Sequence, residues 1–237
     1  QISEIEAAVK ENHVKVEVIT QLRFTDATKR VKSFIESGGL GRVLSANLKM
    51  NYYRSPEYYG NGKSWRGTWN MDGGGALMNQ GIHGVDLIQY FMGGVKSITA
   101  QCRTLLHNIE TEDVANAIVE YNNGAVGMIQ CTTLCKPGYP RTIEIMGEKG
   151  TIVLQEDVIS EWNVEGCEES TNDKVSGNSS SNPAEIPNCF HKKQIEDLLC
   201  AIAEERTPFV DVTEGAKAVK VILAAYESSK EGRKIEL

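Results

Sequence analysis

The chain has 237 residues, of which 41% are hydrophobic and 24% are charged, and its formal net charge at pH 7 is −7. These values are typical of a globular protein that can bury a full apolar core. The acidic balance argues against a nucleic-acid partner, which would require clustered Lys and Arg, and no apolar run reaches the roughly 18 residues of a membrane span.

The start of the chain is predicted to form one helix and one strand. Ile2, Ile5 and Val9 have helical spacing, and the Val-rich stretch VKVEVIT at residues 14–20 predicts a strand directly after them. The chain opens at Gln1 rather than at Met. A lone helix and strand at this place are typical of the end of an α/β sheet, so we expect the chain to be a fragment.

A second helix is predicted from residue 25, where Thr25 is a plausible N-cap, to the Gly38-Gly39 pair. The next segment, RVLSANLKMNYYR, alternates in polarity and predicts a half-buried strand. Its expected inward residues are Leu44, Ala46, Leu48, Met50 and Tyr52.

The most informative stretch is GGGALMNQGIHGVDLIQYFMGG, Gly73 to Gly94. A helix starting near Asn79 would project Asn79, His83 and Asp86 from one side. The glycines before it would allow a ligand to approach the backbone closely. Alternatively, Asn79 caps the helix, Asp86 is solvated, and His83 is a hydrogen-bonded core residue.

Six segments of period two follow and predict antiparallel hairpins: SITAQCRTL, VANAIVEY, AVGMIQCTTL, RTIEIMG, TIVLQ and VISEW. Residues 165–187 are rich in Ser, Asn and Glu and predict a surface loop. Two helices close the chain. The first would turn Ile195, Leu198, Leu199 and Ile202 inward, and the second could begin with a capping box at Asp211 and Glu214.

These elements predict an α/β (α+β) fold with an open, predominantly antiparallel sheet and helices packed on one face. Six scattered cysteines without a CxxC pair indicate reduced thiols and a cytoplasmic protein. Cys131 and Cys135 have the spacing closest to that of a metal pair, and we expect no metal site there. His13 and His107 are expected at the surface.

Several stretches resemble the Gfo/Idh/MocA family of NAD(P)-dependent oxidoreductases. They are the Gly73–Gly94 stretch together with QLRFTDATKRVKSFIESGGLGRV, YNNGAVGMIQCTT, RTIEIMGEKGTIVL and the closing RTPFVDVTEGAKAVKVILAAYESSKEGRKIEL. The resemblance implies that residues 1–22 are the C-terminal remnant of a dinucleotide-binding Rossmann domain. Residues 23–237 would be the substrate-binding, catalytic and oligomerisation domain.

The same resemblance implies the cofactor and the partners. NAD or NADP would be bound mainly by the missing N-terminal domain, because no G-x-G-x-x-G stands between a strand and a helix here. The substrate would be a sugar, a polyol or a sugar derivative, and the open sheet face would form a homodimer or homotetramer. The fragment alone would be inactive.

The resemblance also implies roles for single residues. His83 matches the histidine that acts as general acid/base on the substrate hydroxyl, and Asn79 stands where many members have aspartate. Arg23 matches a position near the cofactor cleft, although an arginine exposed to solvent is an alternative. The expected substrate contacts are Trp65, Arg66, Trp69, Tyr139, Arg141 and His191.

Two other functions compete with this hypothesis. One is a non-enzymatic module that binds a sugar or mediates oligomerisation. The other is a metal-dependent hydrolase using His83 and Asp86, which lacks further ligands because only four histidines exist and none forms an HxH or HExxH spacing.

Overall fold

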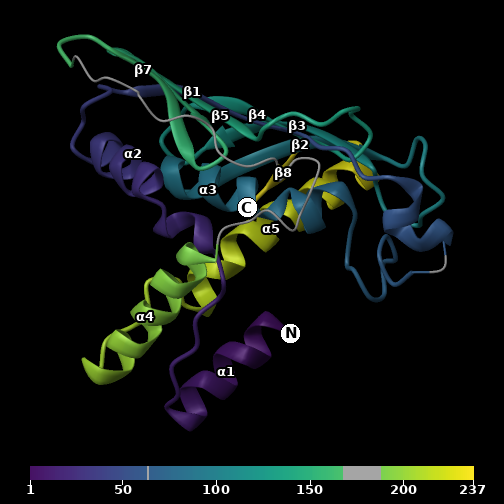
Figure 1. The fold of residues 1–237 in the computed structure, drawn as a ribbon, viewed down its shortest axis with the longest axis horizontal. Helices are drawn as coiled ribbons and strands as arrows, with labels where there is room; N and C mark the ends of the chain where they lie inside the picture. Colours follow the sequence, from purple (N-terminus) through teal and green to yellow (C-terminus); the bar gives the residue numbers. More distant parts are fainter. Residues whose placement is uncertain (63, 168–187) are drawn as a thin grey trace.

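The computed structural model describes residues 1–62, 64–167 and 188–237. Most of the predicted surface loop at 165–187 therefore lies outside the described residues. One eight-stranded sheet forms the upper layer of the molecule, with strand order β7-β6-β5-β1-β4-β3-β2-β8 (Figure 1). Only β1 and β4 pair in parallel, and every other neighbouring pair in this sheet is antiparallel. The expected open, predominantly antiparallel sheet is confirmed.

Strands β1 to β7 match predicted segments, whereas β8 was not predicted. They are β1 (Val43–Asn51), β2 (Val95–Arg103), β3 (Val114–Tyr121), β4 (Val126–Thr132), β5 (Thr142–Gly147), β6 (Gly150–Gln155), β7 (Val158–Val164) and β8 (Ile235–Glu236). The helices are α1 (Ile2–Asn12), α2 (Asp26–Glu36), α3 (Ile82–Met92), α4 (Cys189–Ala203) and α5 (Val212–Glu231). Three short helical turns complete the fold: η1 (Gln21–Phe24), η2 (Pro56–Gly62) and η3 (Ala76–Gln80).

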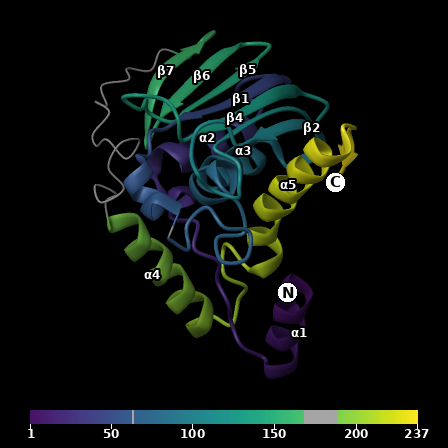
Figure 2. The ribbon, with the colours of Figure 1, turned by 90° about the vertical axis from the view of Figure 1, so that its right-hand side faces the viewer.

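Helices α2, α3 and α5 cover one face of the sheet, whereas α1 and α4 project away from it (Figure 2). The predicted cap at Thr25 is confirmed, and so is the Asp211 half of the predicted capping box. The Thr28 N–H donates to Thr25 Oγ1 at 3.0 Å, and the Glu214 N–H donates to Asp211 Oδ1 at 2.8 Å. Each contact satisfies a backbone donor that the first turn of a helix leaves without a partner. Among the described residues, no helix combines the length and the apolarity needed to cross a bilayer.

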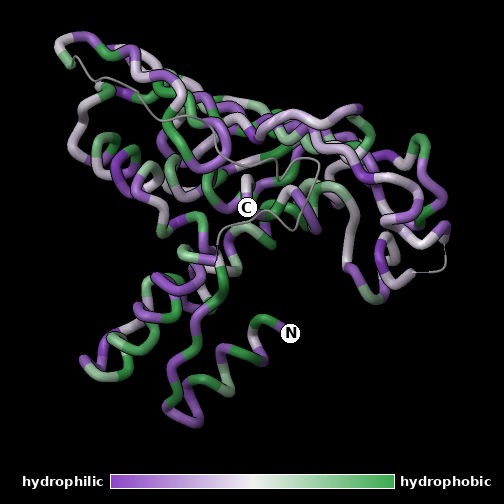
Figure 3. Tube along the Cα trace, viewed as in Figure 1, coloured by the Kyte–Doolittle hydropathy of each residue, from purple (hydrophilic) through white to green (hydrophobic). Residues whose placement is uncertain are grey.

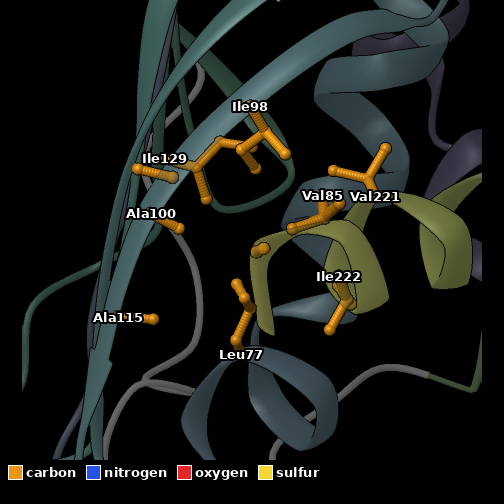
Figure 4. Close-up of a pocket in the computed structure, with 10 residues that line it drawn as sticks. Leu77, Val85, Ile98, Ala100, Ala115, Ile129, Val221 and Ile222 are labelled. Atoms are coloured by element: carbon orange, nitrogen blue, oxygen red, sulfur yellow. The ribbon is translucent and has the colours of Figure 1, made fainter. Parts of the chain in front are cut away.

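The core lies between the sheet and helices α3 and α5. A void of about 10 Å³ remains there, and Figure 4 shows aliphatic side chains from both layers pointing into it. Such a void is about the size of one water molecule and has only hydrocarbon walls, so it is a packing gap and not a ligand site. Its lining residues are Leu77, Val85, Ile98, Ala100, Ala115, Ala117, Ile129, Val221, Ile222 and Ala225.

Strand β1 departs from its expected alternation at one residue. Ala46, Leu48 and Met50 are buried as predicted, but Leu44 is 43% exposed. The pairing of β1 with β5 shifts register between Val43 and Ser45. Such a bulge inserts one residue and reverses the side on which its neighbours point, so the inward placement of Leu44 was wrong.

Residues 14–20, predicted as a strand, have no strand neighbour among the described residues. The segment is held by one backbone hydrogen bond, from the Val18 N–H to the Val210 carbonyl at 2.8 Å, and by one side chain. Gln194 of α4 accepts a hydrogen bond from the Thr20 N–H at 2.9 Å and donates one to the Val18 carbonyl at 2.8 Å. A high β-propensity cannot form a strand by itself, because the ladder requires a second backbone.

The predicted inward face of α4 was also wrong. Ile195, Leu199 and Ile202 are all more than half exposed, whereas Gln194 and Ala201 are buried. Hydrophobic and hydrophilic residues alternate along this projecting helix in Figure 3. The helix therefore contacts the rest of the described chain through a narrow polar and small-residue face.

The difference in burial between β5 and α4 predicts that the same Ile→Ala substitution destabilises the protein unequally in the two elements. Ile145 of β5 is 0% exposed and Ile195 of α4 is 52% exposed. We expect Ile145→Ala to lower the free energy of unfolding by about 2–5 kcal/mol, because it removes buried methylene groups and leaves a cavity. Ile195→Ala should change it by about 0.5 kcal/mol or less. Urea denaturation measures both, and equal losses would contradict the burial described here.

Candidate active site

The glycine-rich stretch forms a wide turn that starts before the predicted helix. The turn η3 is π-helical, and the Gly81 N–H donates to the Ala76 carbonyl five residues back at 2.8 Å. Helix α3 continues from Ile82. The expected helix start near Asn79 was therefore three residues late, since a π turn has no hydrophobic period of its own. Turns of this kind are frequent at functional sites.

A buried carboxylate holds the start of this turn. Glu112 Oε2 accepts a hydrogen bond from the Gly75 N–H at 2.9 Å, and Oε1 accepts one from the Leu77 N–H at 2.7 Å. The Glu112 carbonyl also accepts from the Ala76 N–H at 2.8 Å. Three donors that the first turn of a helix leaves free are thus satisfied by one residue.

The glycines make room for protein rather than for a ligand. A Cβ atom on Gly75 would lie 1.8 Å from the Glu112 carbonyl oxygen, and one on Gly74 would lie 2.2 Å from the Tyr226 hydroxyl. Both distances are far below van der Waals contact. The expectation that these two glycines admit a ligand was wrong.

His83 lies at the start of α3 and is partly buried. It borders a cavity of about 80 Å³ whose lining residues are Val18, Ile19, Thr20, Leu22, Ile82, His83, Asp86, Gly215, Ala218 and Val219. His83 and Asp86 therefore share one side of α3, as predicted from their spacing. Neither ring nitrogen of His83 bonds to another described residue, in contrast to the hydrogen-bonded core histidine of the alternative interpretation.

Burial lowers the pKa of His83 from 6.5 to about 4. The positive charges of Arg141 and His191 lower the pKa further, and Asp157 opposes them. The imidazole is consequently neutral near pH 7. These interactions place His83, Arg141 and His191, three of the predicted site residues, within electrostatic reach of one another.

Arg141 and His191 each keep one nitrogen without a partner among the described residues. Arg141 is buried, and its Nη2 donates to the Glu156 carbonyl at 2.6 Å and to Asp157 Oδ1 at 2.9 Å. Its Nε is buried and unpartnered, as is Nδ1 of His191. A buried polar atom of this kind loses hydration without compensation. Neither Arg141 nor His191 is among the residues that line the cavity beside His83.

Asn79 faces a different set of neighbours. Its Nδ2 donates to Asp72 Oδ1 at 2.6 Å, and its Oδ1 accepts from Gln80 Nε2 at 2.8 Å and from the Tyr58 hydroxyl at 3.5 Å. Asn79 lies within η3 and makes no side-chain cap there. The capping alternative for Asn79 was therefore wrong.

The other predicted substrate contacts lie on the loop before η3 and beyond β4. Trp65 and Trp69 are each 49% exposed, so neither is sealed in the core. The Arg66 guanidinium lies over the rings of Tyr58 and Trp65, at 4.7 and 4.8 Å from their centroids. Tyr139 is exposed. Because Tyr58 also bonds Asn79, the structure joins Arg66 to the candidate site through that ring.

Arg23 is not a surface residue. Its side chain is 0% exposed, with Nε and Nη2 donating to the two carboxylate oxygens of Asp86 at 2.8 and 2.6 Å and Nη1 donating to Glu214 at 2.9 Å. The exposed arginine and the solvated Asp86 were both wrong alternatives. Burial raises the pKa of Asp86, and the adjacent guanidinium opposes this rise. A cofactor contact of Arg23 stays a prediction.

Sequence reasoning missed Glu112 and Tyr226, and it misplaced His107. His107 is buried, with its N–H donating to Asp113 Oδ2 and its Nε2 lying 3.0 Å from the Arg54 carbonyl. The acidic pair Glu112-Asp113 directly before β3 was a local signal that could have been noticed. Its partners, however, lie on distant segments.

The part of the chain that the structure describes contains no set of side chains that could bind a metal ion. No group of three or more His, Cys, Asp and Glu side chains is arranged there to hold an ion. None of the six cysteines forms a disulfide with another described residue. The hydrolase alternative based on His83 and Asp86 gains no support from this arrangement.

Comparison with known proteins connects the site to characterised relatives. A family model described as the GFO/IDH/MocA C-terminal domain matches residues 28–153. The chain is 26% identical to D-apiose dehydrogenase of Rhizobium rhizogenes over 231 residues, which cover 91% of the chain and 62% of that protein. It is also 26% identical to levoglucosan dehydrogenase of Pseudarthrobacter phenanthrenivorans, covering 62% of the chain and 44% of that protein. The chain thus spans less than two thirds of these relatives.

A solved structure shows the same fold. The WlbA dehydrogenase of Bordetella pertussis, in complex with NADH and UDP-GlcNAcA, superposes with a TM-score of 0.84 at 30% sequence identity. The match covers 100% of this chain and 67% of that one.

The lowered pKa of His83 predicts how stability depends on pH. Because the folded protein favours the neutral ring, the stability associated with His83 should fall as pH drops from 6.5 towards about 4. His83→Gln should lose less stability over this window than the wild type. Urea denaturation across the window, with NMR titration of the His83 ring, measures both, and a titration midpoint near 6.5 would contradict the prediction.

The buried ion pair predicts non-additive substitutions. Arg23→Met should cost about 3–5 kcal/mol, because it leaves the Asp86 charge buried without its partner. Adding Asp86→Asn should restore much of that loss. Arg42→Met is the control, because the Arg42–Glu148 pair is exposed and should contribute about 1 kcal/mol or less. If the loss of unfolding free energy in the double variant equals the sum of the losses in Arg23→Met and Asp86→Asn, the two residues are not coupled.

Proposed function

The chain belongs to the GFO/IDH/MocA family, and from that premise we propose that it is the substrate-binding and catalytic part of an NAD(P)-dependent oxidoreductase. The reaction transfers a hydride between a CH–OH group of a sugar, polyol or sugar derivative and a nicotinamide. The observation that carries the proposal is His83, a neutral imidazole on a cavity wall whose ring nitrogens have no partner among the described residues.

The proposed role of His83 is to move a proton. A carbinol carbon releases hydride readily only as the hydroxyl proton leaves, so a base must lie beside that oxygen. A histidine with its pKa lowered to about 4 is in its base form at neutral pH. The imidazolium formed on accepting the proton would return it readily to water, because the lowered pKa favours the neutral ring.

Neighbouring residues would bind and orient the substrate. Arg141 Nε is a buried donor and His191 Nδ1 a buried donor or acceptor, both without partners among the described residues and suited to hydroxyl groups. Asn79 would orient the reacting part of the substrate with a neutral amide. Trp65 and Trp69 offer half-exposed aromatic faces on which a sugar ring could stack, and Arg66 and Tyr139 would border the same space.

The cofactor would meet this chain only at its reactive end, where the nicotinamide accepts or donates hydride. Thr20 and His83 border the same cavity, and Thr20 Oγ1 is buried without a partner in the described part of the chain. These polar atoms fit a nicotinamide approaching His83. Arg23 fits a cofactor contact less well, because all three of its nitrogens already bind carboxylates.

The substrate class follows from the relatives. Two are named for D-apiose and levoglucosan, and the similar WlbA dehydrogenase was solved with NADH and UDP-GlcNAcA. These compounds share a carbohydrate framework with several hydroxyl groups. We therefore propose a carbohydrate substrate, and turnover by a protein that joins this chain to a dinucleotide-binding unit; the chain alone would bind without oxidising.

The uncovered sheet face would form the interface of a homodimer or homotetramer. Ile118 of β3 is 66% exposed and is paired directly with Met128 of β4, which is also exposed beside Val126. Large apolar side chains grouped on an otherwise polar surface are typical of protein contacts. Analytical ultracentrifugation of Ile118→Lys tests this assignment.

His83→Ala tests the catalytic proposal. In the protein that unites this chain with its dinucleotide unit, we expect kcat for NAD(P)H formation to fall by about a hundredfold or more, the usual scale of a general base. His13→Ala, which changes an exposed histidine, is the control. Sugar binding without turnover in the wild type would instead favour a non-enzymatic module, and an unchanged kcat in His83→Ala would remove His83 from the mechanism.

A further inference from the structure

The carboxylate of Glu112 is enclosed by donors from two elements. The residue is 3% exposed, and besides Gly75 and Leu77 it accepts a hydrogen bond from the Tyr226 hydroxyl of α5 at 3.0 Å. An ionised carboxylate only accepts hydrogen bonds. Its oxygens therefore match this set of N–H and O–H donors.

We propose that Glu112 and Tyr226 are positioning residues, which hold the turn η3 in the geometry that places Asn79 and His83 for the reaction. This inference rests on the proposed function. Neither residue touches the cavity beside His83. Their influence on the reaction would pass through the backbone of residues 75–83.

The turn requires such a restraint. A π-helical turn is wider than an α-turn and is rarely stable without support. Its first N–H groups point away from the helix and carry the positive end of the helix dipole. Glu112 satisfies both demands, because it supplies acceptors and negative charge at the start of the turn that leads into α3.

In the described part of the chain, no basic side chain bonds to Glu112 in competition with the turn. The ionisable groups that face it are Tyr226 of α5, Cys102 of β2 and Cys131 of β4. Burial raises the pKa of both thiols, that of Cys102 to about 12, so they stay neutral. Among the described residues, the carboxylate is therefore committed to the turn and to Tyr226.

Tyr226 extends this restraint to the substrate loop. Its hydroxyl lies so close to Gly74 that a Cβ there would be 2.2 Å away, and the Trp69 ring packs edge-on against it at 5.3 Å between centroids. One side chain thus contacts the carboxylate, the glycine run and an aromatic residue proposed to bind substrate. Removing its hydroxyl should loosen all three relative to His83.

Tyr226→Phe and Tyr121→Phe form a matched pair of variants. Tyr121 is buried and Tyr226 is partly buried, and the Tyr121 hydroxyl donates one hydrogen bond, at 3.0 Å, to the Ala46 carbonyl in the sheet. We expect losses of Tm of similar size, because each variant deletes one hydrogen bond donated by a tyrosine hydroxyl. Only Tyr226→Phe should lower kcat, by about tenfold, with KM within about twofold, since small misplacements of reacting groups reduce rate more than binding. Glu112→Gln should lower kcat by about a hundredfold.

Amide hydrogen exchange supplies a readout that needs no turnover. Exchange at Gly75, Leu77 and residues 79–83 should be faster in Tyr226→Phe and unchanged in Tyr121→Phe. If the wild-type protein oxidises no carbohydrate, the proposed function fails, while exchange still decides whether Glu112 and Tyr226 hold the turn. Unchanged exchange in Tyr226→Phe, or a raised KM with wild-type kcat, would overturn the positioning role.

Discussion

Helix α3 packs so closely on β1 that a Cβ atom on Gly84 would meet the side chains of Leu48 and Met50 at 2.7 and 2.6 Å. This contact fixes the height of α3 above the sheet. The ion pair between Arg23 and Asp86 fixes it sideways against η1 and, through Glu214, against α5. His83 therefore sits on a segment that is restrained by packing on one side and by charge on the other.

The same arrangement explains why the pKa of His83 is lowered. Restraining α3 in the interior also removes water from the ring at its start, and this desolvation lowers the pKa of His83. The same burial raises the pKa of Asp86, whose charge is retained because Arg23 binds both of its oxygens. One environment thus holds a neutral imidazole and an ion pair three residues apart.

The two faces of the sheet differ in how far they are covered. The covered face carries α2, α3 and α5 and closes the core almost without voids. The uncovered face exposes Ile118, Val126 and Met128 among polar neighbours, which suits it to contact another chain. The projecting α4 adds a second exposed apolar stripe, formed by Ile195, Leu199 and Ile202, whereas its fully buried residues are Gln194 and Ala201.

Local patterns in the sequence were enough to predict seven of the eight strands of the sheet, the caps at Thr25 and Asp211, and the shared side of His83 and Asp86, because neighbours within a few residues decide these features. Contacts between distant segments decided the rest. Gln194 replaces a strand partner for a segment 174 residues earlier, and Glu112 captures a turn 37 residues before it. No period or propensity encodes such partners, since each forms only after the chain has folded.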